Sequence, residues 1–244
     1  MKINWDSEVL SSVSKVVDQL EHLSINKDSI ESVADWLAYE EFPIPNSAAV
    51  RDDADDFIRA TMFMNTLNFA FTDFDKSIKY EVNEDEKILS DSEAMYFQVN
   101  NAISSGIQLT DGNEMASISL QQLKNIFVGN IEMPMLKERV EILNEVGQKL
   151  VDSYEGDWIN FINNGPKKLY SDGDGLIERL IEEFPRFDDS SQFKESNVKF
   201  YKLAQLAFWV IHAELSGSNY FKIEDMNSMT AFADYIIPVA LNLK

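Results

Sequence analysis

An aspartate lies among apolar and aromatic residues near the end of the chain, in the run Phe232-Ala233-Asp234-Tyr235-Ile236-Ile237-Pro238. Burying a carboxylate without a partner is costly. Asp234 is therefore expected either to be satisfied by local hydrogen bonds, for example as a helix cap, or to be reserved for a ligand. A second run, Phe200-Tyr201-Lys202-Leu203-Ala204-Gln205, also places polar groups among rings and aliphatic side chains.

The residues available for other chemistry are few. The chain has no cysteine, and its only histidines are His22 and His212. Histidine-rich metal sites and Cys-His nucleophile pairs are therefore excluded or strained, and carboxylates must carry any catalysis. His212, on a mainly apolar helix, is expected to be a satisfied structural histidine.

Glycine-containing patterns give no evidence of a ligand-binding loop. Asp172-Gly173-Asp174-Gly175 resembles the start of a calcium loop, but Leu176 occupies the next ligand position. A turn in which Asp174 caps a helix that begins at Leu176 explains the run better. No glycine-rich phosphate loop is present, which argues against a nucleotide triphosphatase or a dinucleotide enzyme. The sequence predicts no metal and no cofactor.

The charge of the chain limits its partners. The 244 residues include 42 acidic and 21 basic side chains, so the net charge is -21. This field repels polymeric nucleic acid and anionic membranes, although a few local cations can still hold one phosphate of a small molecule. Without cysteine, a leader or an apolar run of about 20 residues, the chain is predicted to be soluble and cytoplasmic. The oligomeric state is not predicted.

Apolar residues recur mostly at helical spacing. The predicted helical stripes are Leu10 to Leu20, a helix capped by Asp28 and Glu31 that carries Val33, Trp36 and Leu37, Phe57 to Phe71, Leu136 to Leu150, Leu176 to Phe184, and a last helix that starts near Val198. Each of these helices should bury one face.

A small β-hairpin is predicted between the helices. Ile78, Tyr80 and Val82 alternate with polar residues, and residues 83–86 can turn the chain back towards Ile88 and Leu89. No internal repeat or low-complexity linker divides the chain. The simplest organisation is one mainly helical domain over residues 1–244.

Five groups of residues, in this order along the chain, resemble the queuosine salvage protein family. They are Thr66-Leu67-Asn68-Phe69-Ala70-Phe71, Pro134 with Glu138-Arg139 and Ile142-Leu143-Asn144, Phe184-Pro185, Phe200-Tyr201-Lys202 with Ala204-Gln205, and Phe232-Ala233-Asp234-Tyr235 with Pro238. The resemblance covers residues 57–244, while residues 1–56 are recognised weakly. It implies a mainly helical fold, distantly like helix-hairpin-helix DNA glycosylases. It also implies a metal-independent N-glycosidase that releases queuine from queuosine 5'-monophosphate.

Breaking a ribose C1'–N bond requires an anionic carboxylate near C1', donors for the leaving base, and aromatic faces to hold that base. The resemblance assigns the carboxylate to Asp234, with Tyr235 beside it. It makes Asn68, Phe69 and Phe71 candidates for the wall that holds the base. Asp189 and Lys202 become candidates for polar contacts to ribose or phosphate.

Each of these residues also has a structural explanation. Phe69 and Phe71 could belong to the core, Asn68 could brace helices, and Lys202 could be a solvated charge.

The chain also departs from the family pattern. Asn101 and Ile236 stand where the family has arginine, and Val210 stands where it has an acid. Neither Asn nor Ile can bind an anion through a bidentate fork. A non-catalytic relative that binds a nucleoside-like ligand or a protein partner is therefore the alternative function. A DNA glycosylase is disfavoured, because such an enzyme needs a basic surface.

Overall fold

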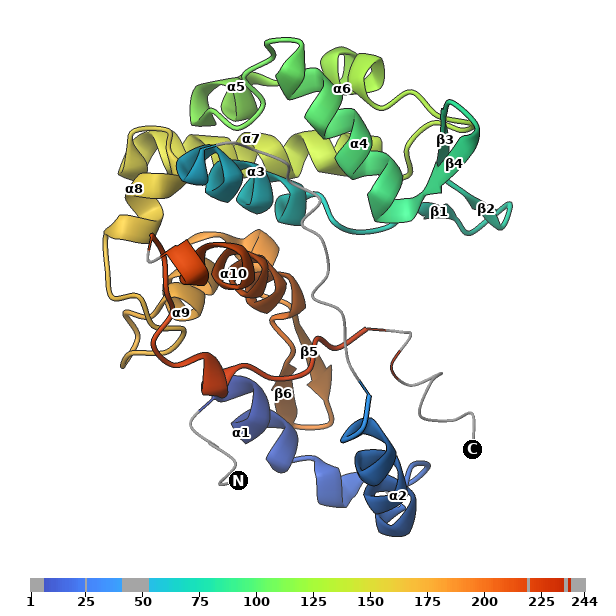
Figure 1. Cartoon of the computed structure of the whole chain (residues 1–244), viewed down its shortest axis with the longest axis vertical. Helices are drawn as coiled ribbons and strands as arrows, with labels where there is room; N and C mark the ends of the chain where they lie inside the picture. The colour runs from blue at the N-terminus through green and yellow to red at the C-terminus, as the bar shows by residue number, and fades with distance from the viewer. Residues whose placement is uncertain (1–6, 25, 41–52, 219, 235–236, 238–244) are drawn as a thin grey trace.

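Helices make up most of the molecule, and short antiparallel strand pairs lie between them (Figure 1). The computed structural model describes residues 7–24, 26–40, 53–218, 220–234 and 237. The helices are α1 Glu8–Ser14, α2 Lys27–Leu37, α3 Ala54–Thr66, α4 Asp91–Ser104, α5 Gly112–Ser117, α6 Leu120–Ile126, α7 Leu136–Tyr154, α8 Trp158–Asn163, α9 Leu176–Glu183 and α10 Lys202–Leu215, with short 3₁₀ turns η1 Val17–Gln19, η2 Pro185–Phe187, η3 Ser216–Ser218 and η4 Met226–Ser228. The predicted mainly helical fold is confirmed. The likeness to helix-hairpin-helix glycosylases stays a prediction.

Helix α7 forms the base of the upper group of helices in Figure 1, which also contains α4, α5 and α6. Its predicted stripe is confirmed, since Leu136, Leu143 and Leu150 are all buried. Helix α5 packs closely on α7 at Gly147, where an added Cβ would lie 2.3 Å from the backbone nitrogen of Ala116. The absence of a side chain at Gly147 therefore allows the two helices to approach.

Helix α3 lies between the upper group and α10, and it packs against α10. Both helices contribute fully buried side chains, such as Phe63 from α3 and Phe208 from α10. Burial of such side chains is the main source of stability in a fold of this kind. The predicted stripe from Leu176 to Phe184 is confirmed as α9, which also contacts α10.

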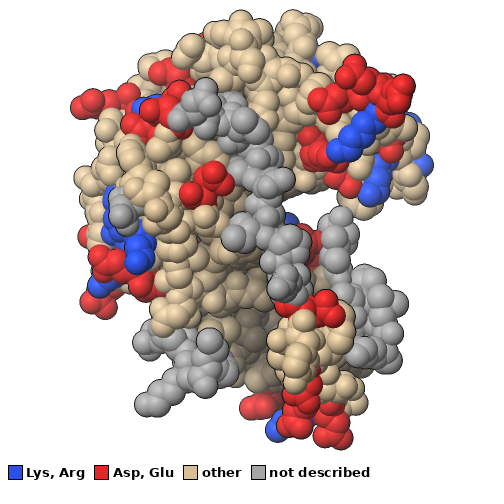
Figure 2. Space-filling model, viewed as in Figure 1, with Lys and Arg blue, Asp and Glu red and all other residues tan. Residues whose placement is uncertain are grey.

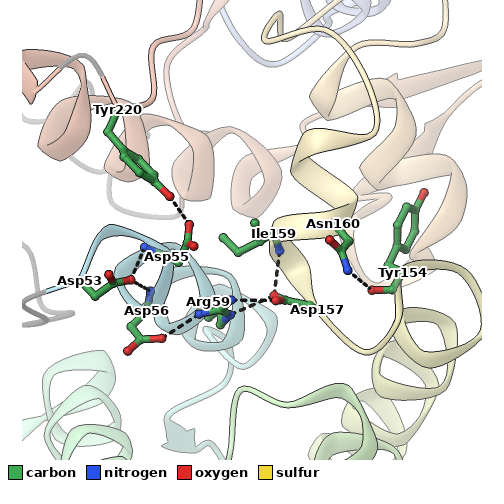
Figure 3. A network of polar contacts seen from close by, with 9 residues as sticks. All are labelled: Asp53, Asp55, Asp56, Arg59, Tyr154, Asp157, Ile159, Asn160 and Tyr220. Carbon is green, nitrogen blue, oxygen red and sulfur yellow. Dashed lines mark hydrogen bonds and ion pairs between the residues drawn. The ribbon is translucent and has the colours of Figure 1, made fainter.

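A polar network fixes the first turn of α3 against α8 (Figure 3). Asp53 caps α3 by accepting hydrogen bonds from the backbone amides of Asp55 and Asp56. Arg59 donates two hydrogen bonds to Asp157, at 2.9 and 2.7 Å, and Asp157 in turn caps α8. Figure 3 also shows Tyr220 reaching the same end of α3, where its hydroxyl donates to Asp55.

Among the described residues, three antiparallel strand pairs lie between the helices in the sequence. Strands β3 Glu81–Glu84 and β4 Lys87–Ser90 form a hairpin at the predicted turn, with Val82 opposite Leu89, but Ile78 and Tyr80 of the predicted first strand lie outside this pair. Two further pairs were not predicted, namely β1 Thr72–Asp73 with β2 Ile78–Lys79, and β5 Ser190–Phe193 with β6 Ser196–Lys199. They are too short or too polar to show clear alternation.

The predicted first helix is wrong in length and in its buried face. Helix α1 ends at Ser14, and its region buries Val9, Ser12 and Val16 rather than Leu10, Val13, Val17 and Leu20. The physical reason is docking against β6: the backbone amide of Lys199 donates to the Ser12 hydroxyl at 2.9 Å, so the serine faces inwards.

The predicted start and buried face of the second helix also need correction. Asn26, not Asp28, caps α2, because the Asn26 side chain accepts from the backbone amide of Ser29. Among the described residues of α2 none is buried, and Trp36 is 60% exposed. The apolar stripe of α2 is therefore not buried against the described residues.

Two other helix ends differ from the prediction. Helix α3 stops at Thr66 instead of continuing to Phe71, and α10 begins at Lys202 because Val198 belongs to β6. At α9 the N-cap residue is Gly175, and the side chain of Glu178 in the first turn accepts from its amide, so the predicted cap by Asp174 is wrong.

Candidate functional site

Arg139 of α7 organises the chain that follows α3. The side chain is fully buried, and it donates to the backbone carbonyls of Pro134, Leu67, Phe69 and Ala70. A helix could not continue here, because the carbonyls turn towards the guanidinium and Ala70 takes a left-handed conformation with φ 47°. The end of α3 at Thr66 is therefore a consequence of this buried cation.

Two guanidinium groups lie over the ring of Phe69. The Cζ atom of Arg139 is 4.3 Å from the ring centroid, and that of Arg186, in η2, is 4.5 Å away. Arg139 also lies 5.2 Å from the ring centroid of Phe71. Contacts of this kind stabilise a cation when it is removed from water. The Nε atom of Arg186 donates to the carbonyl of Thr66 at 2.8 Å. Arg186 therefore stabilises the C-terminal end of α3, although it is distant from Thr66 in the sequence.

Both arginines remain charged near neutral pH. Burial, followed by repulsion from Arg186, lowers the pKa of Arg139 to about 10. Burial also lowers the pKa of Arg186 to about 10, and the nearby carboxylate of Asp189 opposes that shift. The Phe69 ring therefore lies within a positively charged environment in a protein whose net charge is -21.

Asn68 acts as a brace in this structure. Its side-chain amide donates to the hydroxyl of Tyr96 at 3.0 Å and so joins the end of α3 to α4. Phe69 and Phe71 are half-buried, and Phe71 packs against the core. The structural explanations considered for Asn68 and Phe71 are thus observed, while their predicted part in holding a base stays a prediction.

Asp189 follows η2 and immediately precedes β5. Its backbone carbonyl accepts from the amides of Phe200 and Tyr201, at 2.9 and 3.2 Å, while its side chain is exposed. Tyr201 has a left-handed conformation with φ 49° and forms the N-terminal cap position of α10. By bonding the amide of Tyr201, the backbone of Asp189 helps to place Lys202, which follows Tyr201 in the sequence.

Lys202 and Asp234 form an ion pair. The Nζ atom of Lys202 lies 2.6 Å from Oδ2 of Asp234, and the two side chains are 26% and 24% exposed. The partner of Asp234 is thus a side chain 32 positions earlier in the sequence, and Lys202 is not the isolated solvated charge that was considered. The same two segments also meet where the rings of Trp209 and Phe232 lie nearly edge to face, with centroids 5.9 Å apart. Tyr235 and Ile236 lie outside the described residues.

Some of the predicted site residues are linked by a ring contact, an electrostatic interaction, backbone hydrogen bonds and an ion pair. Phe69 lies under Arg186, Arg186 lies near Asp189, and Asp189 holds the backbone just before Lys202, which pairs with Asp234. Three cations accompany this series: Arg139, Arg186 and Lys202. Segments that are far apart in the sequence therefore meet in one region.

Sequence reasoning gave no role to Arg139 and did not single out Arg186. A signal for Arg139 was available, because Leu136, Arg139, Leu143 and Leu150 follow the spacing of one buried helical face. An arginine on such a face needs several acceptors. No comparable signal exists for Arg186, whose burial depends on contacts with α3.

The described part of the chain contains no group of three or more His, Asp or Glu side chains arranged to hold a metal ion. Within the same residues, no helix combines the length and apolar character needed to cross a membrane. His212 is satisfied structurally as predicted, since its Nδ1 accepts from the backbone amide of Ile223 at 3.0 Å.

Comparison with known proteins identifies the family. The family model described as queuosine salvage protein matches residues 48–244. A queuosine 5'-phosphate N-glycosylase/hydrolase of Sphaerobacter thermophilus is 25% identical over 237 residues, which are 96% of this chain and 71% of the relative. Relatives of the same name from Bos taurus and Mus musculus are each 30% identical, over 72% and 77% of this chain and 51% and 55% of their own length.

The chain thus spans about half the length of its mammalian relatives and more of the bacterial one. The matched region contains all the predicted site residues, from Asn68 to Tyr235. Because the family model covers well over half of the sequence, the chain belongs to the queuosine salvage protein family.

Proposed function

We propose that this protein is an N-glycosidase that hydrolyses queuosine 5'-monophosphate, or a related 7-deazapurine nucleoside, and releases queuine. The observation that carries the proposal is the Lys202–Asp234 ion pair, which joins the predicted carboxylate to a predicted substrate-binding lysine. The names of the relatives support the same reaction class.

Asp234 serves in this proposal as the carboxylate at the ribose. As the C1'–N bond breaks, C1' gains positive charge, and an anionic carboxylate stabilises it or directs a water molecule onto it. The water oxygen bonds to C1', one proton of that water leaves, and the departing base nitrogen ends with a proton. Lys202 holds the carboxylate in place at 2.6 Å.

Lys202 can also contact the substrate directly. An ammonium group has three N–H donors, so Lys202 can keep its bond to Asp234 and still donate to a ribose hydroxyl or to the 5'-phosphate. Together with Arg186 it supplies local positive charge for an anionic nucleotide. A small phosphate ester is therefore compatible with a chain of net charge -21.

The base is proposed to lie against Phe69 and Phe71, with Asn68 near them, and Tyr235 is proposed to bind the substrate beside Asp234. An aromatic ring holds a flat heterocycle by offset or edge contacts. The arginines beside Phe69 fix the orientation of that ring. Asp189, whose side chain is exposed next to Arg186, is proposed to bind a ribose hydroxyl.

The test is base release from queuosine 5'-monophosphate, followed by chromatography. The wild-type protein should release queuine, and Asp234→Asn should lower kcat by about 100-fold or more, because a transition-state charge loses its stabiliser. Asp91→Asn is the matched control: Asp91 forms a similar half-exposed pair with Lys79 at 2.9 Å, away from these contacts. Equal rates for the Asp234 variant and the wild type would contradict the assignment of Asp234.

A non-catalytic relative is the second candidate. Asn101, on the exposed face of α4, and Val210, packed against the core by α10, take positions where the family pattern has charges. Thermal stabilisation by queuine without any release of base from the nucleotide would favour this binder. Turnover that Asp234→Asn abolishes would dismiss it.

The distribution of charge supports the prediction that polymeric nucleic acid is not a ligand. Figure 2 shows Lys and Arg interspersed with Asp and Glu on the visible face. Near the hairpins, Lys76, Lys79 and Lys87 each pair with a carboxylate. Binding of duplex DNA that weakens as salt is raised would contradict this prediction.

A further inference from the structure

The side chain of Gln205 is fully buried, and both its amide nitrogen and its amide oxygen form hydrogen bonds. Its nitrogen donates to the backbone carbonyl of Phe200 at 3.0 Å. Its oxygen accepts from the backbone amide of Thr230 at 2.8 Å and from the Thr230 hydroxyl at 3.0 Å. Gln205 therefore joins the start of α10 to the segment that carries Asp234.

Three side chains on one face of α10 contact the segment that carries Asp234. Lys202, Gln205 and Trp209 are spaced by three and four residues, so their side chains lie on the same side of the helix. They contact Asp234, Thr230 and Phe232 respectively. Of these contacts, the Gln205 contact is the one in which a fully buried side chain bonds to the backbone of the segment.

We propose that Gln205 is a positioning residue, which sets the register of residues 230–234 on α10 and thereby places the Asp234 carboxylate at Lys202. The part of this inference that concerns catalysis rests on the proposed function of Asp234. The part that concerns position does not.

The chemistry of the side chain explains why a glutamine suits this position. Its amide supplies one acceptor that receives two donors from Thr230, and one donor for the carbonyl of Phe200. Methionine has a similar length but neither function. Glutamate keeps the acceptor, yet its second oxygen would face the Phe200 carbonyl without a proton to donate.

The experiment has a structural readout that does not need turnover. With fluorotryptophan incorporated, the ¹⁹F resonance of Trp209, assigned from Trp209→Phe, reports its contact with Phe232. We expect this resonance to shift most in Gln205→Met. It should shift less in Thr230→Val, which keeps the backbone bond, and in Gln205→Glu, which keeps the acceptor for Thr230 but loses the bond to Phe200.

Gln98→Met is the matched control. Gln98 is also a buried amide with two partners, the hydroxyl of Tyr80 at 2.7 Å and the carbonyl of Val128 at 2.8 Å, but it contacts neither α10 nor the segment 230–234 in these bonds. Its variant should leave the Trp209 resonance unchanged. It therefore separates a local effect from the general loss of a buried amide.

The kinetic readout is the division between kcat and KM for base release. Displacing the carboxylate by about 1 Å should lower kcat by roughly 10- to 100-fold in Gln205→Met with a smaller change in KM, whereas Gln205→Glu should recover part of kcat. Gln98→Met should keep the wild-type kcat.

The possible failures are distinguishable. If the wild-type protein releases no base, the proposed function fails, and the Trp209 resonance still tests the position. If the Trp209 resonance of Gln205→Met is unchanged, or kcat equals that of Gln98→Met in an active protein, the positioning role is overturned. Should Gln205→Met not fold, an unshifted Trp209 resonance in Thr230→Val would overturn it instead.

Discussion

The two sides of the candidate site are held in different ways. The side that contains Phe69 is built around Arg139, which is fully buried and donates to four backbone carbonyls. The side that contains Asp234 is an extended segment held on α10 by side-chain contacts, and the Lys202–Asp234 pair is about one quarter exposed. The side that contains Phe69 is part of the core, whereas the side that contains Asp234 lies on the surface of the core.

This difference predicts which mutations should change stability and which should change activity. Removing a buried donor leaves several acceptors unsatisfied, and that cost falls on folding. Breaking a partly exposed ion pair costs little because water replaces the partner. Mutations on the Phe69 side should therefore affect the free energy of unfolding, while those at Asp234 should affect catalysis.

The largest effect is expected for Arg139→Met. The carbonyls of Leu67, Phe69, Ala70 and Pro134 lose their common donor, so the free energy of unfolding should fall by about 3–5 kcal/mol. Urea denaturation measures this change. Lys137→Met, an exposed position on the same helix, is the control and should change stability by less than about 0.5 kcal/mol. A loss below about 1 kcal/mol for the Arg139 variant would remove the basis of the comparison.

A smaller effect is expected at the opposite end of α3. Arg59→Gln removes the two bonds to Asp157 and the bond to Asp56, all of which are partly exposed, so about 1 kcal/mol should be lost. Lys76→Gln, which breaks the more exposed pair with Asp73, should cost less.

The pH dependence of the Arg59 pair gives a second measurement. Burial alone would raise the pKa of Asp157, but hydrogen bonds from Arg59 and the amide of Ile159 lower it below its usual value near 3.8. The stabilisation is therefore present above that usual value and is lost as pH falls through the folded-state pKa. The difference in stability between wild type and Arg59→Gln should shrink in acid, and a constant difference would contradict this account.

His212 should produce a pH effect on the segment that leads to Asp234. Burial, and then the charge of Lys222, lower the pKa of His212 below its usual 6.5, and its Nδ1 accepts from Ile223 only in the neutral form. The unfolded chain thus binds this proton at higher pH than the folded protein does. Stability from His212 is complete above about 6.5 and is lost as pH falls towards the folded-state pKa.

The measurement is the melting temperature between pH 7.5 and 5 for wild type and for His212→Asn, whose oxygen can accept the same amide. We expect a flatter pH profile for the variant. His22→Asn, at an exposed position, should keep the wild-type slope. An unchanged slope in His212→Asn would show that another group governs this range.

The smallest effect on stability is expected for Asp234→Asn. Because both partners of its ion pair are about one quarter exposed, the free energy of unfolding should change by less than about 1 kcal/mol, even though turnover is lost. Urea denaturation in parallel with the assay of base release tests this contrast. A loss as large as that of Arg139→Met would mean that both sides of the site belong to the core.

Helical periodicity alone predicted the helices that bury a continuous apolar stripe. Helices α7 and α9 are examples, and the β3–β4 hairpin followed from alternation around a polar turn. Element ends were predicted less well. The end of α3 depends on Arg139, and the start of α10 depends on a carbonyl of Asp189, which are both distant in the sequence.

For the candidate site, the family resemblance pointed to Asp234, Lys202 and Phe69, and the structure pairs Lys202 with Asp234. The functional roles of all three residues stay predictions. The sequence did not indicate that Lys202 pairs with Asp234 or that Arg186 lies over Phe69. Such pairings depend on the separation of side chains in space, for which a single sequence contains no direct signal.

By itself the sequence determined the mainly helical class, the strongly acidic charge and the absence of thiol chemistry, because these follow from composition and short-range periodicity. Only the tertiary structure decided which charges are buried, where helices stop and which polar groups meet. The physical reason is that a buried polar side chain must find its hydrogen-bond partners wherever the fold provides them: the acceptors of Arg139 and the donors to Gln205 come from segments elsewhere in the chain.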